Sequence, residues 1–179
     1  MTGKELYKAV CALGYQTSLE FDENFYTAAN IALFSLSRLV PEIKTLTLSK
    51  EKGEYDMTEL TDDFGSFSPS PIHELVCGYD YRTEGHSRLV VLREGKNEHL
   101  TVEYKRKPRE ITLDNFEDEI DISESCADML ILLSAFYVFL DDDPDKAEIF
   151  FLRYKEQAGE VIKDRNNALF EKVINVTGW

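Results

Sequence analysis

Apolar residues recur at helical spacing near the start of the chain. Between residues 23 and 39 they fall every three or four positions, which predicts an amphipathic helix. Asp22 is a suitable N-cap for this helix, and Pro41 ends it because proline lacks a backbone N–H. A shorter pattern predicts a helix over residues 4–13, with Gly14 as its C-terminal stop. Two helices are therefore expected before the first strand.

The helical spacing returns near the C-terminus. One predicted helix begins at Ser123 or Ser125, ends at Leu140, and is apolar on nearly all sides from its middle onward. Such a helix belongs at the centre of a core. Residues 144–165 form the next predicted helix, since Asp143 is a good N-cap and a proline follows it at the first helical position.

Between these helices the pattern changes to the alternation of β-strands. Residues 43–49 alternate leucine with threonine, and a short strand is expected near Tyr55, followed by a single helical turn at 61–64. The β-rich runs 88–93 and 99–104 flank a Gly-Lys-Asn turn, which predicts a hairpin between them. The strands are thus grouped together and do not alternate with helices.

This grouping predicts an α+β fold, because βαβ alternation is missing. We expect residues 1–41 and 110–167 to form one helical bundle and residues 42–109 to form a small inserted antiparallel β lobe. Asn166 and Asn167 are expected to end the last bundle helix, which leaves residues 168–179 as a separate C-terminal arm. Hydrophobic residues make up 43% of the 179 positions and aromatic residues 12%, enough for a sizeable core.

The charge of the chain is concentrated in one segment. The protein has 34 acidic and 20 basic residues, a net charge of −14, which argues against a general nucleic-acid binder. Residues 110–148 contain 13 acids and one base, Lys146, so the acidity is local. We therefore expect one acidic surface, with these candidate members: Glu117, Asp118, Glu119, Asp121, Asp141 and Asp142.

The sequence contains no motif typical of catalysis or cofactor binding. It has no glycine-rich phosphate loop, no nucleophile elbow and no His-Glu-x-x-His pattern, and its three cysteines lack metal-ligand spacing. His86 and His99 flank the predicted hairpin, where a cross-strand polar pair is favoured over a metal site. The clustered carboxylates favour helix N-termini, the alternative being a hard-cation site. No enzyme activity, cofactor or metal is expected.

Two other segments are candidate partner-binding sites. The basic run at the end of the last predicted strand could contact phosphate or an acidic surface, or be a solvated strand end; it contains Lys105, Arg106, Lys107 and Arg109. The C-terminal arm could fold back on the bundle or dock on another chain. Its candidate contact residues are Phe170, Val173, Ile174, Val176 and Trp179.

The layout resembles the head–tail connector, or adaptor, proteins of tailed bacteriophages, including tail-tubular and head-completion adaptors. The similarity covers most of the chain and is one of layout, since no single motif is diagnostic. It includes a helix rich in small residues followed by a strand, a turn before the next strand in which Thr61 replaces a common proline, an apolar helix, an Asp-Pro turn and a terminal arm. These segments are residues 25–33, 43–49, 55–64, 120–129, 143–154 and 173–179.

The resemblance implies a non-enzymatic virion protein that assembles into a homo-oligomeric ring. Such a ring would bind the portal protein and the tail or neck proteins, with genomic DNA only passing through its channel. An acidic lumen would repel the DNA. The expected location is the neck or tail of the virion, reached from the host cytoplasm during assembly, without membrane contact. The main alternative is an acidic protein-binding module such as a DNA-mimic inhibitor; an enzyme with a carboxylate metal site is a further one.

Overall fold

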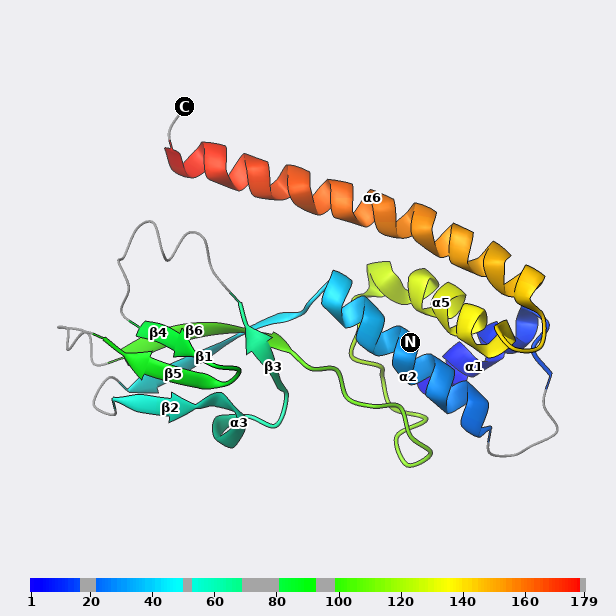
Figure 1. Cartoon of the computed structure of the whole chain (residues 1–179), viewed down its shortest axis with the longest axis horizontal. Coiled ribbons are helices and arrows are strands. Elements are labelled where there is room, and N and C mark those ends of the chain that lie inside the picture. Colours follow the sequence, from blue (N-terminus) through cyan, green and yellow to red (C-terminus); the bar gives the residue numbers. More distant parts are fainter. Residues whose placement is uncertain (17–21, 50–52, 69–80, 93–98, 178–179) are drawn as a thin grey trace. The chain divides into compact units, whose positions relative to one another are not determined.

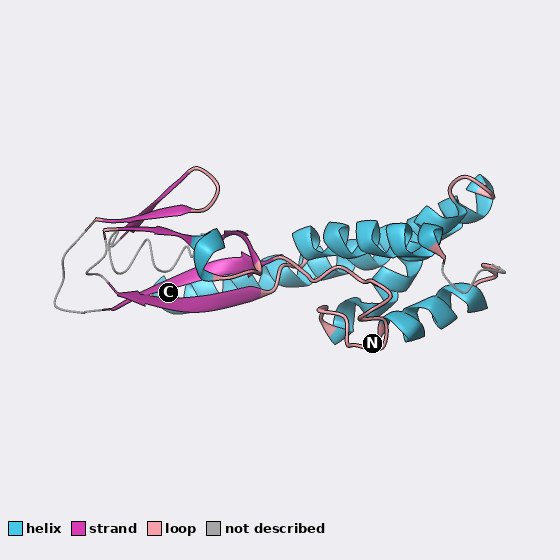
Figure 2. Cartoon of the chain, turned by 90° about the horizontal axis from the view of Figure 1, so that it is seen from below, coloured by secondary structure: helices cyan, strands magenta, loops and turns pink. Residues whose placement is uncertain are grey.

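The chain folds into two compact units. The computed structural model describes residues 1–16, 22–49, 53–68, 81–92 and 99–177, with side chains in the last range given up to Asp164. Met1–Val40 and Glu110–Trp179 form the first unit, here called the helical unit, and Pro41–Arg109 form the second, here called the β unit. All described strands belong to the β unit, and all described helices except one short helix belong to the helical unit (Figure 2). The fold is α+β.

The helical unit is built around its most apolar helix. Its elements are α1 (Gly3–Ala12), α2 (Glu23–Leu39), the 3-10 turn η1 (Glu124–Cys126), α5 (Ala127–Phe139) and α6 (Pro144–Thr177), shown in Figure 1. α5 contacts α1, α2 and α6. Its apolar residues extend all round the helix, so every side of α5 can bury surface against a neighbour. The prediction of a central apolar helix is confirmed.

Local capping signals determine where these helices begin. Thr2 forms a reciprocal capping box with Glu5 at the start of α1. Asp22 and Asp143 each accept a hydrogen bond from the backbone N–H three residues further on, at 3.2 and 3.1 Å. Gly14 follows α1 with a φ of +99°, a conformation that other residues rarely adopt. The sequence predicted both aspartate caps and the glycine stop.

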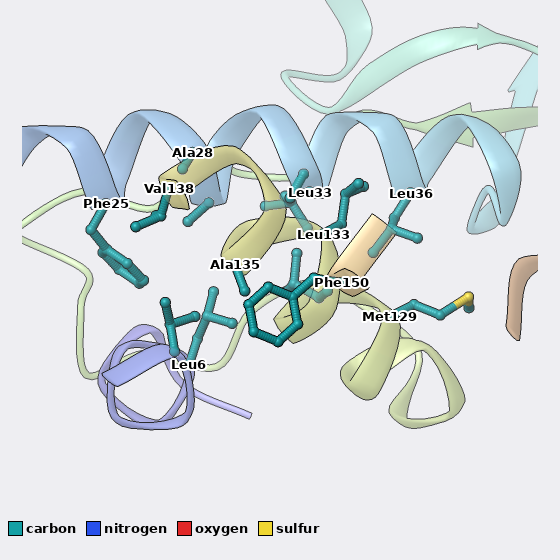
Figure 3. Packing of buried hydrophobic residues seen from close by; sticks show 14 of the residues in the cluster. Leu6, Phe25, Ala28, Leu33, Leu36, Met129, Leu133, Ala135, Val138 and Phe150 are labelled. Carbon is teal, nitrogen blue, oxygen red and sulfur yellow. The ribbon is translucent and has the colours of Figure 1, made fainter. Parts of the chain in front are cut away.

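The core of the helical unit joins residues distant in sequence. Figure 3 shows side chains of α1, α2, α5 and α6 converging. Fully burying one large apolar side chain stabilises a fold by about 1.5–3 kcal/mol, so these residues supply much of the stabilisation. The largest fully buried ones are Leu6, Val10, Phe25, Leu33, Leu36, Met129, Leu130 and Leu133.

The last helix is longer than the sequence pattern predicted. α6 passes through Asn166 and Asn167 and ends at Thr177, so the predicted helix end near Arg165 is wrong and residues 168–177 continue α6. Asparagine lowers helix propensity by only a fraction of 1 kcal/mol relative to good helix formers. Residues of higher helix propensity flank the pair, and the segment that follows contains neither glycine nor proline before residue 178.

The β unit contains two antiparallel sheets of three strands. One has the order β1 (Ile43–Ser49), β6 (His99–Arg106), β3 (Phe64–Phe67), and the other has the order β2 (Glu54–Asp56), β5 (Arg88–Val91), β4 (Tyr81–Glu84). Alternate residues of β6 are buried, as expected for a strand with one face on a core. The core contains Leu48, Tyr55, Met57, Phe64, Leu89, Leu100, Val102 and Tyr104.

The predicted hairpin between residues 88–93 and 99–104 is wrong. β5 pairs with β4 through a turn in which Gly85 has a φ of +63°, and with β2. β6 instead pairs with β1 along its whole length, from Ile43 opposite Lys105 to Ser49 opposite His99. Strand pairing depends on which apolar faces meet across the sheet, and nearby β-rich runs do not fix it.

Two smaller expectations in the β unit fail with the hairpin. The predicted helical turn at 61–64 lies earlier, as α3 (Met57–Leu60), because Asp56 caps it by accepting from the Thr58 backbone N–H at 3.0 Å. His86 and His99 do not form the expected cross-strand pair. His86 lies in the β4–β5 turn with its ring 6.0 Å from that of Phe64, and His99 is opposite Ser49.

Candidate functional site

The first group of predicted acidic residues lies on a segment fastened to the start of α1. Glu117, Asp118 and Glu119 are exposed. The Lys4 backbone N–H donates to the Phe116 carbonyl at 3.0 Å, and the Lys4 side chain pairs with Glu117 at 2.6 Å. Since Glu119 also forms a β-bridge with Thr2, the backbone holds this acidic surface in place.

The second group, Asp141 and Asp142, lies in the turn between α5 and α6. Both residues are exposed. This turn is near the other end of α1, because a Cβ added at Gly14 would come within 2.6 Å of Lys146 Nζ. α1 has 10 residues and a length of about 15 Å, so the acids form two separate surfaces and not the single one expected. Asp121 is half-buried beside the first group.

These carboxylates do not assemble into a metal site in the part of the chain that the structure describes. Among those residues there is no group of three or more His, Cys, Asp or Glu side chains positioned to hold an ion. Asp143 instead caps α6, the role expected for acids at a helix N-terminus. The described helices also include none that is long and apolar enough to cross a membrane.

The residues of the basic run differ in their exposure and in their contacts within the β unit. Arg106 Nε donates to Asp63 at 3.0 Å, and its Nη1 donates to Glu42 at 3.2 Å. Lys105 is half-buried on β6, whereas Lys107 and Arg109 are exposed. Much of the charge of Arg106 is therefore balanced within the β unit.

The side chain of Asp63 joins several described residues of the β unit, and the sequence did not single it out. Its carboxylate accepts from Lys44 at 2.7 Å, from the Tyr104 hydroxyl at 2.8 Å, from Arg106 and from Thr61. Burial alone would raise the pKa of Asp63, but the hydrogen bonds from Lys44, Thr61 and Tyr104 outweigh it and hold that pKa well below its usual range. The hydrogen bond to Asp63 likewise raises the pKa of Lys44.

This carboxylate is a structural centre. Its donors come from β1, from β6 and from the turn that precedes β3, so it joins all three strands of one sheet. The acid-rich turn before Phe64 was the only feature of the sequence that could have pointed to Asp63. The hydrogen-bond donors to Asp63 could be identified only once the register of β1 and β6 was known.

The predicted C-terminal contact residues lie at the end of α6. Phe170, Val173, Ile174 and Val176 fall within the helix, and Trp179 is outside the described residues. α6 has 34 residues and α5 has 13, so their lengths are about 51 and 20 Å. The two helices are antiparallel, and the distal part of α6 extends beyond α5 (Figure 1). Three large apolar side chains on the preceding part of α6 are exposed: Ile149, Leu152 and Ile162.

No protein-family model and no curated protein matches the chain. Its function therefore has to be inferred from its own elements. The basic run belongs to the β unit, whereas the acidic surfaces and the end of α6 belong to the helical unit. Of these candidates, the end of α6 continues beyond the helix against which α6 packs.

Proposed function

We propose that the protein is a non-enzymatic head–tail connector subunit of a tailed bacteriophage. In this role, copies form a ring around the DNA channel and bind the portal protein and tail or neck components. The observation that carries the proposal is the length of α6, whose distal part continues beyond α5. A helix that continues past the helix it packs against can provide a contact element for a neighbouring chain.

The sequence of the distal part of α6 supports an intermolecular contact. Leu169, Val173 and Val176 are spaced i, i+4 and i+7, the spacing of one helix face. An isolated helix of this length is marginal in water, and most helical stability comes from packing an apolar face. A partner that packs against this face would stabilise this part of α6, and a heterologous contact repeated around an axis closes into a ring.

The acidic surfaces fit a channel that DNA passes through without being bound. Exposed carboxylates at 117–119 and 141–142 lie on the helical unit, and phosphates are repelled by a surface of the same sign. The proposal places at least one of these surfaces toward the lumen. If both faced the outside of an assembled ring, this part of the proposal would be wrong.

The proposal is tested by assembly of the full chain. Native mass spectrometry and negative-stain microscopy are applied to the protein alone and with the portal protein encoded in the same genome. We expect a closed ring for the wild type and none for a variant with Val173→Asp and Val176→Asp. Asn167→Asp is the control, because it adds one charge to the same segment without replacing an apolar residue.

Two results would overturn the connector role. One is a wild-type chain that stays monomeric in both samples. The other is a monomer that blocks the DNA binding of another protein, as a DNA mimic would. Circular dichroism of the double variant is measured alongside, so that loss of assembly is distinguished from loss of folding.

A further inference from the structure

One sheet of the β unit ends at β1, which is the longest edge strand among the described ones. β1 has seven residues and pairs with β6 along its whole length without a register shift. No described strand pairs with its other side. The other edge strands have three or four residues, and β3 also has a register shift between Phe64 and Ser66. A long, regular edge is a template for pairing with a further strand.

The hydrogen bonds of this sheet determine which backbone groups of β1 face outward. The Arg106 N–H donates to the Glu42 carbonyl at 2.9 Å, so these two residues form a hydrogen-bonded pair. In antiparallel sheets such pairs alternate with pairs that are not bonded to each other. Since Ile43 lies opposite Lys105, the odd-numbered residues of β1 direct their N–H and C=O groups away from β6.

A hydrogen bond on the far side of β6 agrees with this alternation. The Ser68 N–H donates to the Glu103 carbonyl at 3.1 Å, so Glu103, which lies opposite Thr45, directs its carbonyl toward β3 and away from β1. The corresponding outward groups of β1 belong to Ile43, Thr45 and Thr47, and no described residue forms a hydrogen bond with them. Each of these three residues therefore offers one donor and one acceptor.

The side chains of β1 do not protect this edge. Ile43, Thr45 and Thr47 are exposed and β-branched, and such residues are favoured in strands. Edge strands in proteins are usually protected by an exposed lysine, a proline or a bulge. Lys44 is the only charged residue of β1, and its side chain is bonded to Asp63 at 2.7 Å within the β unit. The edge therefore lacks these protections.

The β unit carries little net charge, unlike the chain as a whole. Residues 41–109 contain 13 acids and 11 bases, a net of −2, against −14 for the whole protein. Charge repulsion therefore opposes contact between two β units far less than contact between two helical units. A second copy of the same edge suits this site, because its donors and acceptors have the same spacing.

We propose that β1 binds β1 of a second copy, antiparallel and about a two-fold axis at Thr45, so that their two three-stranded sheets join into one. In this register Thr45 lies opposite Thr45 of the second copy, and Ile43 lies opposite Thr47. All three outward-facing residues then form hydrogen-bonded pairs, and no like charges lie opposite each other.

Pairing about a neighbouring residue fits less well. An axis at Leu46 would place Ile43 opposite Ser49, whose carbonyl already accepts from the Tyr55 hydroxyl. An axis at Lys44 would extend the pairing to Pro41, which has no N–H to donate. The register about Thr45 avoids both.

This contact does not rest on the connector role. It involves the β unit alone, and an isologous contact closes after two copies, whereas the proposed ring needs a heterologous one. The full chain with Val173→Asp and Val176→Asp should therefore lose the ring and keep the β1 contact. Failure of either proposal leaves the other standing.

The test is sedimentation equilibrium of the full chain carrying Val173→Asp and Val176→Asp, which isolates the β1 contact from that of α6. We expect a reversible monomer–dimer equilibrium. Thr45→Pro should weaken the dimer about tenfold or more, because it removes both N–H groups at the two-fold axis. Proline is tolerated on an edge strand where the N–H faces solvent, so the fold should persist. Thr45→Val is the control, since it keeps the N–H and should leave the dimer unchanged.

A pair of lysine variants tests the register without proline. Thr45→Lys places two like charges directly opposite each other and should weaken the dimer severalfold. Thr47→Lys, at an equally exposed position of the same strand, places its lysine opposite Ile43 and should have a smaller effect. Equal effects of the two substitutions would overturn the proposed pairing.

Amide exchange of the wild-type chain is an independent measurement. The Thr45 and Thr47 amides should exchange fast in dilute solution and become protected at high concentration, whereas the Leu46 amide, which faces β6, should be protected in both. The proposal is overturned if these two amides are already protected in dilute solution, because another part of the chain would then cover the edge. It is also overturned if the α6 variant stays monomeric at millimolar concentration, or if Thr45→Pro and Thr45→Val dimerise equally.

Discussion

In the β unit, the carboxylate of Asp63 accepts hydrogen bonds from four side chains, whereas in the helical unit the carboxylate of Asp22 accepts one from the backbone N–H of Phe25 and caps α2. The described core of the β unit contains eight buried apolar residues, and that of the helical unit contains twenty. A small core offers little stability in reserve, so the β unit depends on polar links between its strands. The larger core of the helical unit supplies more of its stability through the burial of apolar side chains.

The largest expected effect is a loss of stability in the helical unit alone, caused by a change in its core. Leu133→Ala in α5 removes a fully buried side chain and should cost about 3–5 kcal/mol, through lost burial and the cavity that remains. Hydrogen exchange should show reduced protection in α2, α5 and α6, with β1 and β6 unchanged. Leu152→Ala, at a 52% exposed position on α6, is the control and should cost little. An equal loss of protection in both units would show that they unfold as one.

The next effect concerns the polar centre of the β unit. Asp63→Asn removes the charge that Lys44 and Arg106 share and leaves both cations without their partner. We expect a loss of about 2–3 kcal/mol in the free energy of unfolding of the β unit, measured by exchange of β1 and β6 amides. Asp62→Asn, an exposed neighbour, should change it by less than about 0.5 kcal/mol. Similar losses in the free energy of unfolding for the two variants would show that Asp63 is not a structural centre of the β unit.

The same carboxylate should make the β unit sensitive to acid. The pKa of Asp63 is lower in the folded chain than in the unfolded chain, where it is about 3.9. Its stabilising contribution is therefore present above that value and is lost as the pH falls through the folded pKa. The difference in unfolding free energy between wild type and Asp63→Asn should stay constant above about pH 5 and shrink steadily as the pH falls below about 4. A difference that grows on acidification would contradict the assigned direction of the shift.

The smallest effect is a helix cap in the helical unit. Thr2→Ala removes the side-chain acceptor of the α1 capping box and should lower stability by about 1 kcal/mol, measured by thermal unfolding. Thr27→Ala, at an exposed position inside α2, serves as the control. It should be neutral or slightly stabilising, because alanine has the higher helix propensity.

The two units also differ in how far their sequences predict them. Asp22, Asp143 and Gly14 mark helix ends by contacts within a few residues, so α1, α2 and the start of α6 were predicted correctly. β5 and β6 were assigned to one hairpin because they are neighbours in sequence, yet they belong to different sheets. Ile43 pairs with Lys105 although most of the sequence of the β unit lies between them, so no local pattern predicts this pairing.

The candidate sites were likewise predicted where they depend on local sequence and missed where they depend on distant contacts. The acidic residues were found from sequence because their charge is visible there, but their separation into two surfaces depends on how α1 packs. Asp63 was missed because its partners are distant along the chain: Tyr104 is 41 residues from Asp63.

The pairing of β1 with β6 has a consequence for the order of folding. Ile43 lies opposite Lys105, and the Arg106 backbone N–H donates to the Glu42 carbonyl at 2.9 Å, so the chain enters and leaves the β unit at one point. Once these strands pair, the long segment between α2 and α5 acts as a short closed loop. Each halving of the effective loop length saves about 0.6 kcal/mol of closure entropy. A β unit that forms first therefore lowers the entropic barrier to assembling the helical core.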